Sequence, residues 1–152
     1  MENQRKTGAW DPVIGDIRFS SSISPKLDEY SAEIEWGGRR VGVTLYSDAD
    51  LEIASTISLV KDLVNVYPSI HEKVKTYLGK HILPKWADVW QANEIPSIDA
   101  NTLAKHLTLE WITAHADGQA TFWFEAGEVF LGHGLVLSMD KSGTIVDHDT
   151  PG

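Results

Sequence analysis

Histidine and aspartate are the residue types through which this chain could bind a metal ion. The candidate ligands are His106, His115, His133, His148, Asp147 and Asp149. None of the histidines has the HExxH or HxH spacing that brings two imidazoles onto one metal. The chain contains no cysteine, which excludes thiolate sites, thiol catalysis and disulfide bonds. We therefore predict no metal ion and no cofactor.

Serine, histidine and carboxylate residues near the C-terminus are the candidates for catalysis. Ser138 or Ser142 with His133 and Asp140 has the residue types of a triad, but Ser138 and His133 point to opposite faces of one predicted strand. Glu125 and Glu128 could form an acid–base pair, but they flank an exposed hairpin tip, whereas such a pair needs a cleft. We predict no catalytic residues and no enzymatic activity.

His133 occupies an unusual position, on the apolar face of a predicted strand and between Gly132 and Gly134. A lone histidine on such a face is usually a core residue whose ring nitrogens bind backbone or side-chain partners. Glycine in a strand suits the close approach of a ring or another backbone. We predict structural roles for these three residues. His133→Ala should lower stability by roughly 1–3 kcal/mol, because it would leave a buried partner unpaired.

The elements that position these residues are predicted from turns and periodicity. Asp117-Gly118 favours a two-residue type I′ turn, which places Ile112 opposite Trp123. A second turn at Ala126-Gly127 places Trp123 opposite Phe130 and completes a meander. The same register puts the following side chains on the inner face: Leu109, Trp111, Phe122, Phe124, Val129, Leu131, Leu135 and Leu137.

Ile112, Trp123 and Phe130 form an aromatic and apolar row on the other face of this meander, which is solvated in a two-layer domain. Glu110 and Glu125 are direct neighbours on that face by the same register. We expect this row to bind a basic protein, with the aromatic residues as anchors and the two glutamates at the rim. Alternatively, another segment of the chain covers the row, and burial of Trp123 and Phe130 within the monomer would rule the interface out.

The rest of the chain is predicted to add strands before and helices inside this arrangement. A hairpin over 30–46 turns at Gly37-Gly38 and pairs Glu35 with Arg40 as a cross-strand ion pair. The other predicted elements are a strand over 14–19, helices over 48–66, 69–83 and 99–106, a helical segment at Trp86 and Trp90, and a strand over 144–148. The prediction is an α+β fold, an antiparallel sheet built from hairpins with two to three helices inserted mid-chain. We expect one domain over residues 1–152, with residues 1–9 frayed.

Net charge limits the kinds of partner. The chain carries 13 basic and 22 acidic residues, a formal charge of −9, which disfavours nucleic acid and anionic membranes. It has neither the apolar core of a signal peptide nor an apolar run of the ~20 residues that a membrane span needs. We expect a cytoplasmic protein.

Two stretches carry a resemblance to a known group of proteins. They are Glu33-Ile34-Glu35-Trp36-Gly37-Gly38, and Phe122-Trp123-Phe124 followed by Gly127 and Val129-Phe130-Leu131-Gly132-His133. From about Tyr30 to His148 the chain resembles a bacterial family of uncharacterised small domains, which has no assigned catalytic residues. Small acidic domains of this kind look like immunity proteins, so the resemblance implies a cytoplasmic inhibitor that occludes a bacterial toxin. The alternative is a small-ligand-binding protein or enzyme with a pocket near His133, Trp86 and Trp90, between sheet and helices.

Overall fold

The computed structural model describes residues 7–151, in which eight strands form one sheet in the order of the chain. Neighbouring strands are antiparallel except β4 and β5, which run parallel. The strands are β1 (Ala9–Asp11), β2 (Gly15–Ser24), β3 (Leu27–Trp36), β4 (Arg39–Tyr46), β5 (Thr108–Ala114), β6 (Ala120–Glu125), β7 (Leu135–Met139) and β8 (Ile145–Asp149). Parallel neighbours need a long crossover, and all the α-helices lie between β4 and β5 in sequence. The predicted α+β class is confirmed.

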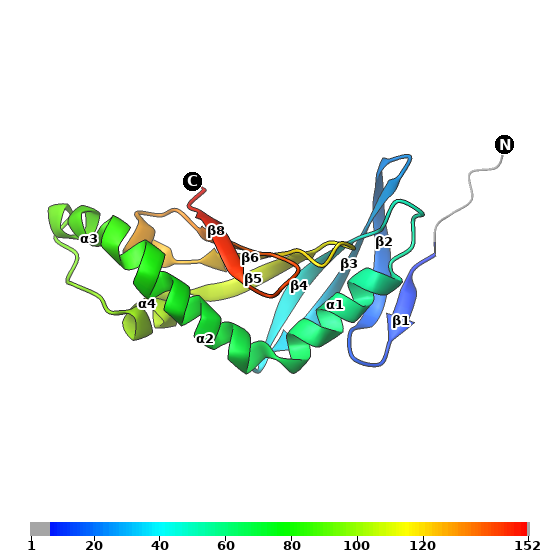
Figure 1. Cartoon of the computed structure of the whole chain (residues 1–152), viewed down its shortest axis with the longest axis horizontal. Helices are drawn as coiled ribbons and strands as arrows, with labels where there is room; N and C mark the ends of the chain where they lie inside the picture. The colour runs from blue at the N-terminus through cyan, green and yellow to red at the C-terminus, as the bar shows by residue number, and fades with distance from the viewer. Residues whose placement is uncertain (1–6, 152) are drawn as a thin grey trace.

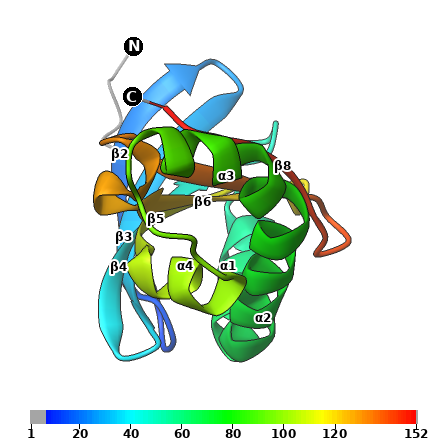
Figure 2. The same ribbon diagram turned by 90° about the vertical axis from the view of Figure 1, so that its left-hand side faces the viewer.

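The helical segments are α1 (Ala54–Asn65), α2 (Tyr67–Tyr77), the π-helical turn η1 (Leu78–Ile82), α3 (Leu83–Ala92) and α4 (Ala100–His106). Helices α1, α2 and α4 lie on one face of the sheet, and α3 continues past the ends of the strands, as Figures 1 and 2 show. Helix α1 contacts β3, β4 and β5, and α2 contacts β8 and α4. The apolar core lies between these helices and the strands. The opposite face of the sheet carries no helix within residues 7–151.

Local chemistry explains where the helices differ from prediction. The carboxylate of Asp48 accepts the N–H groups of Asp50 and Glu52, so residues 48–52 form a turn and α1 begins later than predicted. Pro84 does not break the helical path. It lies in the first turn of α3, where a missing N–H costs nothing, directly after the π-helical turn. Asp99 caps the N-terminus of α4, since its Oδ1 accepts the N–H of Thr102 at 2.7 Å.

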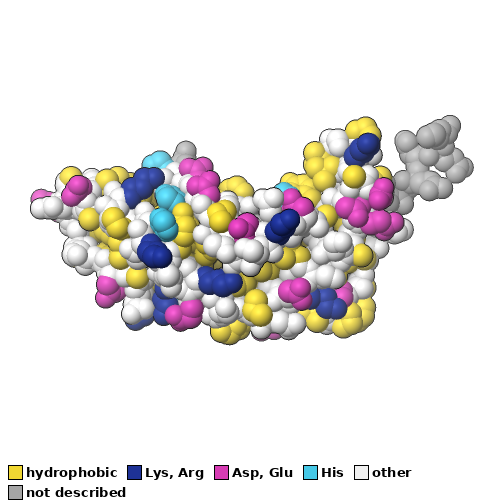
Figure 3. All heavy atoms as spheres, viewed as in Figure 1, with side chains coloured by type: hydrophobic (Ala, Val, Ile, Leu, Met, Phe, Trp, Pro, Cys, Tyr) yellow, Lys and Arg dark blue, Asp and Glu magenta, His cyan; other side chains and the backbone are white. Residues whose placement is uncertain are grey.

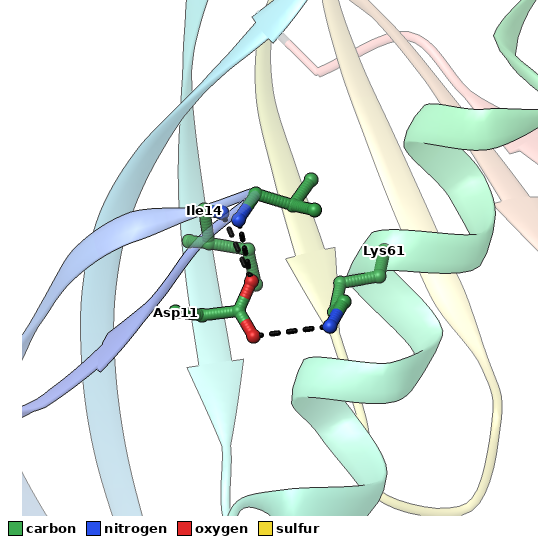
Figure 4. Close-up of polar contacts among 4 residues, drawn as sticks. Asp11, Ile14 and Lys61 are labelled. Atoms are coloured by element: carbon green, nitrogen blue, oxygen red, sulfur yellow. Dashed lines mark hydrogen bonds and ion pairs between the residues drawn. The ribbon is translucent and has the colours of Figure 1, made fainter.

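Asp11 joins the β1–β2 turn to helix α1 (Figure 4). Its Oδ2 accepts the N–H groups of Val13 at 2.8 Å and Ile14 at 3.2 Å, and its Oδ1 lies 3.2 Å from Nζ of Lys61. Burial by itself raises the pKa of Asp11, but the two N–H groups and Lys61 outweigh it and the pKa lies below the ordinary value. This carboxylate thus fixes the edge of the sheet to the helix layer.

The hairpin of β3 and β4 has the predicted register, with Glu35 opposite Arg40 and Ile34 opposite Val41. The predicted ion pair between Glu35 and Arg40 is wrong, because Arg40 binds another glutamate. The guanidinium of Arg40 lies 3.4 Å from the carboxylate of Glu33 instead of that of Glu35. Both side chains of the observed pair are largely exposed, so the pair adds little stability.

The predicted register of the late meander is wrong by one residue at its first turn. His115 and Gln119 close the loop through an N–H to carbonyl bond of 3.0 Å, so three residues separate them instead of two. Ile112 consequently lies opposite Phe122, and both are fully buried on the inner face. Trp111, predicted to point inward, is 39% exposed.

The second predicted turn is also wrong, because residues 126–134 form a loop. The loop contains the 3-10 turn η2 (Gly127–Phe130) and ends at β7, so Trp123 pairs with Val136 instead of Phe130. His133 therefore lies outside any strand. Leu131, predicted to be in the core, has a left-handed backbone and a side chain that is 47% exposed.

Candidate functional site on the open face of the sheet

The strand register builds two rows of side chains across the face that the helices leave uncovered. The first, the tryptophan row, consists of Glu33, Gly42, Trp111, Trp123, Val136 and Asp149, one from each strand from β3 to β8. The second, the hydroxyl row, consists of Ser31, Thr44, Thr113, Thr121 and Ser138 on β3 to β7. The two rows lie side by side, since their members are two residues apart on each strand.

Trp111 lies flat against the neighbouring strand β4. A Cβ atom built on Gly42 would fall 1.9 Å from the Trp111 ring, so the indole occupies the space of the missing side chain. Its Nε1 donates to Oγ1 of Thr44 at 2.7 Å. Glycine at position 42 and threonine at position 44 thus hold one orientation of the ring.

Trp123 repeats this arrangement one strand further along the sheet. Its Nε1 donates to Oγ1 of Thr113 at 3.1 Å, while its ring remains 43% exposed. Val136, the next member of the tryptophan row, is only 8% exposed although it lies on the uncovered face. The hydroxyl row therefore provides acceptors that orient both indoles.

A third aromatic contact extends the face beyond the hydroxyl row. The rings of Tyr46 and His115 are stacked, with centroids 5.2 Å apart and planes 18° from parallel. The hydroxyl of Tyr46 donates to the carboxylate of Glu29 at 3.1 Å. Burial, followed by this hydrogen bond and the negative charge of Glu29, raises the pKa of Tyr46, so the phenol stays protonated.

Acidic side chains outnumber basic ones on this face. By the alternation of the strands, its acids are Glu29, Glu33, Glu35, Glu125, Asp147 and Asp149, and its arginines are Arg18 and Arg40. Beside Trp111, the turn over residues 12–16 and both arginines line a hollow of about 600 Å³. The face combines two fixed indoles, a row of hydroxyls and a surplus of carboxylates.

The predicted interface residues do not all lie on this face. Ile112 and Phe130 are fully buried within the monomer, so their predicted place in an exposed row is wrong. Trp123 is exposed as predicted, but its neighbour in the row is Trp111. This difference follows from the longer loop at residues 115–119, which exchanges the two faces of β5.

The two predicted rim glutamates are both exposed, but they are not direct neighbours. Glu125 pairs with Thr108, and Glu110 lies in an irregularity between Leu109 and Trp111. The predicted row missed Trp111 because the predicted two-residue turn at Asp117-Gly118 placed its side chain on the inner face. Each indole binds a threonine that lies two residues after its own partner in the neighbouring strand, a relation that is visible only once the register is known.

His133 and its two glycines lie in the loop before β7. Gly132 has a positive φ of 87°, and a Cβ atom on Gly134 would fall 3.1 Å from the carbonyl oxygen of Phe124. The ring of His133 is half-buried, and its Nδ1 is buried without a hydrogen-bond partner among residues 7–151. The predicted cause of a stability loss in His133→Ala, an orphaned partner, is therefore wrong. The structural role of the three residues remains a prediction.

Histidines and lysines gather on the helix side of the molecule (Figure 3). There the hydroxyl of Tyr77 lies 2.7 Å from Nδ1 of His148, and Nζ of Lys85 lies 3.3 Å from its Nε2. Burial and then the charge of Lys85 lower the pKa of His148. Within residues 7–151 no three histidine, aspartate or glutamate side chains are placed to hold a metal ion.

Trp90 lines a cavity of about 410 Å³ with Leu83, Gln91 and Ile95. Neither His133 nor Trp86, which were predicted to share a pocket with Trp90, belongs to this lining. The Nε1 of Trp90 instead donates to the carbonyl of Val129 at 2.7 Å, and Trp86 packs edge-on against Phe130. These rings anchor the η2 loop to α3.

Comparisons with known proteins are consistent with the resemblance in the two sequence stretches. No helix in the described part of the chain combines the length and apolarity needed to cross a membrane. No curated protein and no solved structure matches the chain. The model of one family, described as uncharacterised proteins conserved in bacteria (DUF2262), matches residues 11–149. The chain belongs to this bacterial family.

Proposed function

We propose that the chain is a protein-binding module that holds a basic partner on the open face of its sheet. The observation that carries this proposal is the pair Trp111 and Trp123, exposed by 39% and 43% on a face that no helix of the described chain covers. Tryptophan is enriched among the residues that contribute most to protein interfaces. An exposed pair at the centre of a face suits the anchor of such an interface.

Preorganisation supports the same proposal. Because Thr44 and Thr113 already bind the two indole nitrogens, the rings lose little conformational freedom when a partner docks. The surrounding acids, among them Glu125, Asp147 and Asp149, favour a partner with exposed lysine or arginine. Charge of this kind raises the association rate, whereas the buried indoles slow dissociation.

A toxin is the kind of partner that we propose for this face. The resemblance to small acidic immunity proteins suggests that the chain occludes a basic toxin domain in the cytoplasm. In this proposal the chain acts by steric cover and performs no chemistry on its partner. Occlusion requires a broad face, and the rows of this sheet span six strands.

Affinity capture with matched variants tests the binding proposal. The immobilised chain and its Trp111→Ser and Trp123→Ser variants are compared with Trp10→Ser, which removes a tryptophan that is 68% exposed in β1. We expect a basic protein that the wild type and Trp10→Ser retain and that both row variants release faster. A retained protein that is acidic, or one that all four chains hold equally, would contradict the proposal.

Charge reversal tests the role of the acidic side chains, and growth experiments test whether the partner is a toxin. With the captured partner, Asp149→Lys should slow association and flatten its salt dependence, while Asp88→Lys on α3 makes the same charge change away from the face. Expression of the partner alone should stop bacterial growth, and co-expression of the wild-type chain, but not of Trp123→Ser, should restore it. A harmless partner would refute the toxin step and leave the binding step standing.

A further inference from the structure

A second site lies on the other side of the sheet, in a cavity between strands β3 to β6 and helices α2 and α4. Its volume is about 320 Å³, within the roughly 300–1,000 Å³ of small-molecule sites. Apolar and aromatic side chains make up most of the lining: Trp36, Val41, Tyr67, Ile70, Val74, Leu107, Leu109, Phe122 and Phe124. Such a cavity suits an apolar group as its occupant.

Three aromatic rings that contact one another line this cavity from its exposed rim to its buried end. The ring of Trp36 lies 5.7 Å from that of Tyr67 and 6.1 Å from that of Phe122. Tyr67 is 38% exposed, Trp36 is half-buried, and Phe122 is fully buried. The backbone at Gly37 lies close to the ring of Tyr67, and a Cβ atom at this position would fall 3.2 Å from the ring. The cavity therefore runs from a solvent-exposed rim to the apolar core.

Charge at this cavity is opposite to that of the chain as a whole. The chain has 22 acidic residues, but no acid within residues 7–151 lines the cavity, whereas Arg39 and His71 do. Both of these side chains are exposed, and Arg39 forms no ion pair with any residue from 7 to 151. An unpaired guanidinium at the rim of an apolar cavity is a site for a carboxylate, which it can bind through two parallel hydrogen bonds.

We propose that this cavity binds a small apolar monocarboxylate, with the hydrocarbon packed against the rings of Trp36 and Phe122 and the carboxylate on Arg39. His71 supplies a second polar contact at the rim. The site is independent of the open face, since the cavity lies on the side of the sheet that the helices cover. Loss of either binding activity would leave the other unchanged.

Three probes with the same hydrocarbon chain test the charge preference: octanoate, octan-1-ol and octylamine. The net charge of −9 attracts the positively charged octylamine and repels octanoate. A preference for octanoate would therefore come from the local positive charge of Arg39. Binding is measured by calorimetry, and its place is read from the NMR shifts of the Trp36 indole N–H and the Gly37 amide. We expect saturable binding in the order octanoate, octan-1-ol, octylamine.

Adjacent arginines provide the matched variants. Arg39→Gln should weaken octanoate binding by roughly tenfold and leave octan-1-ol unchanged. Arg40→Gln makes the same charge change on the other face of β4 and should alter neither. Ala104→Leu, which extends a side chain of the lining, should weaken all three probes. Equal binding of the three probes, no binding of octanoate, or equal effects of the two arginine variants would overturn the proposal.

Discussion

The indole of Trp111 occupies the space above Gly42 in the neighbouring parallel strand. The ring lies where a Cβ atom of residue 42 would stand, and its Nε1 donates to Thr44 in that strand. The pair joins β4 to β5, the two strands that the helical crossover separates in sequence. A glycine in the middle of a strand thus serves the close approach of a ring.

Gly42→Ala should therefore destabilise the protein, although alanine suits a strand better than glycine. The added carbon would lie 1.9 Å from the indole, and such overpacking costs roughly 1–3 kcal/mol. Urea unfolding measures the loss in free energy. The loss should shrink in a Trp111→Ala background, where no ring opposes the methyl group. An equal cost in both backgrounds would show that the ring does not set it.

Removal of the Asp11 carboxylate should loosen the β1 edge of the sheet. Asp11→Ala deletes the acceptor of two N–H groups and the partner of Lys61, whereas Lys61→Met deletes the ion pair alone. We expect a larger fall in melting temperature for Asp11→Ala. Since the pKa of Asp11 is lowered by folding, its contribution is present above the ordinary pKa and is lost as the pH falls below it. If Lys61→Met matched Asp11→Ala, the backbone bonds would contribute nothing.

The sequence predicts best those elements whose turns and caps are local. Gly37-Gly38 sets the register of the β3–β4 hairpin, and Asp99 sets the start of α4, because each acts on residues next to it. The late meander depends on one loop. The carboxylate of Asp117 accepts the N–H of Gln119, and this hydrogen bond favours the longer loop over a type I′ turn at Asp117-Gly118.

The same one-residue difference decides how much of the candidate site is predictable. A slip of one position exchanges the faces of a strand, so Ile112 moves into the core and Trp111 moves out. Trp123 stays on the uncovered face that the sequence predicts for it, because its alternation with Phe122 is kept in β6. The threonines that orient the indoles come from neighbouring strands, one of them 67 residues away in the chain, and no local pattern connects them.

Stability should fall as the pH is lowered through the titration of His148. Lysine has no acceptor, so Lys85 donates to Nε2 and the neutral ring carries its proton on Nδ1, facing Tyr77. Burial and then Lys85 make the largest contributions to the lowered pKa of His148, and they outweigh the opposing effects of Asp147 and Asp149. Between this lowered pKa and the ordinary value near 6.5, the unfolded chain binds more protons, so acid favours unfolding there.

Urea unfolding between pH 5 and pH 8 measures this effect. The free energy of unfolding of His148→Gln should depend less on pH than that of the wild type, because glutamine cannot take up the proton. His71→Gln is the control, since His71 is an exposed residue on α2. Parallel curves for the wild type and His148→Gln would contradict the assignment.

The final prediction concerns two tryptophans of α3 that contact the same ring. Trp86 and Trp90 both pack on Phe130, but only Trp90 uses its indole nitrogen, which donates to the carbonyl of Val129. The Nε1 of Trp86 is buried without a partner among residues 7–151. A buried polar group without a partner lowers stability, whereas a hydrogen bond raises it. Replacement of tryptophan by phenylalanine should therefore have different effects at Trp86 and at Trp90.

Trp90→Phe should lower the free energy of unfolding by roughly 1–3 kcal/mol for the orphaned carbonyl, in addition to the loss of packing. Trp86→Phe removes the same atoms and no hydrogen bond, so its cost should be smaller. Both variants replace an indole by a phenyl ring, so the cost of the smaller ring largely cancels between them. Urea unfolding measures the difference in free energy that remains, which is the contribution of the hydrogen bond. Hydrogen exchange should quicken in η2 for Trp90→Phe alone, because that bond fixes Val129 to α3. Equal costs for the two variants would show that the bond of Trp90 contributes no net stability.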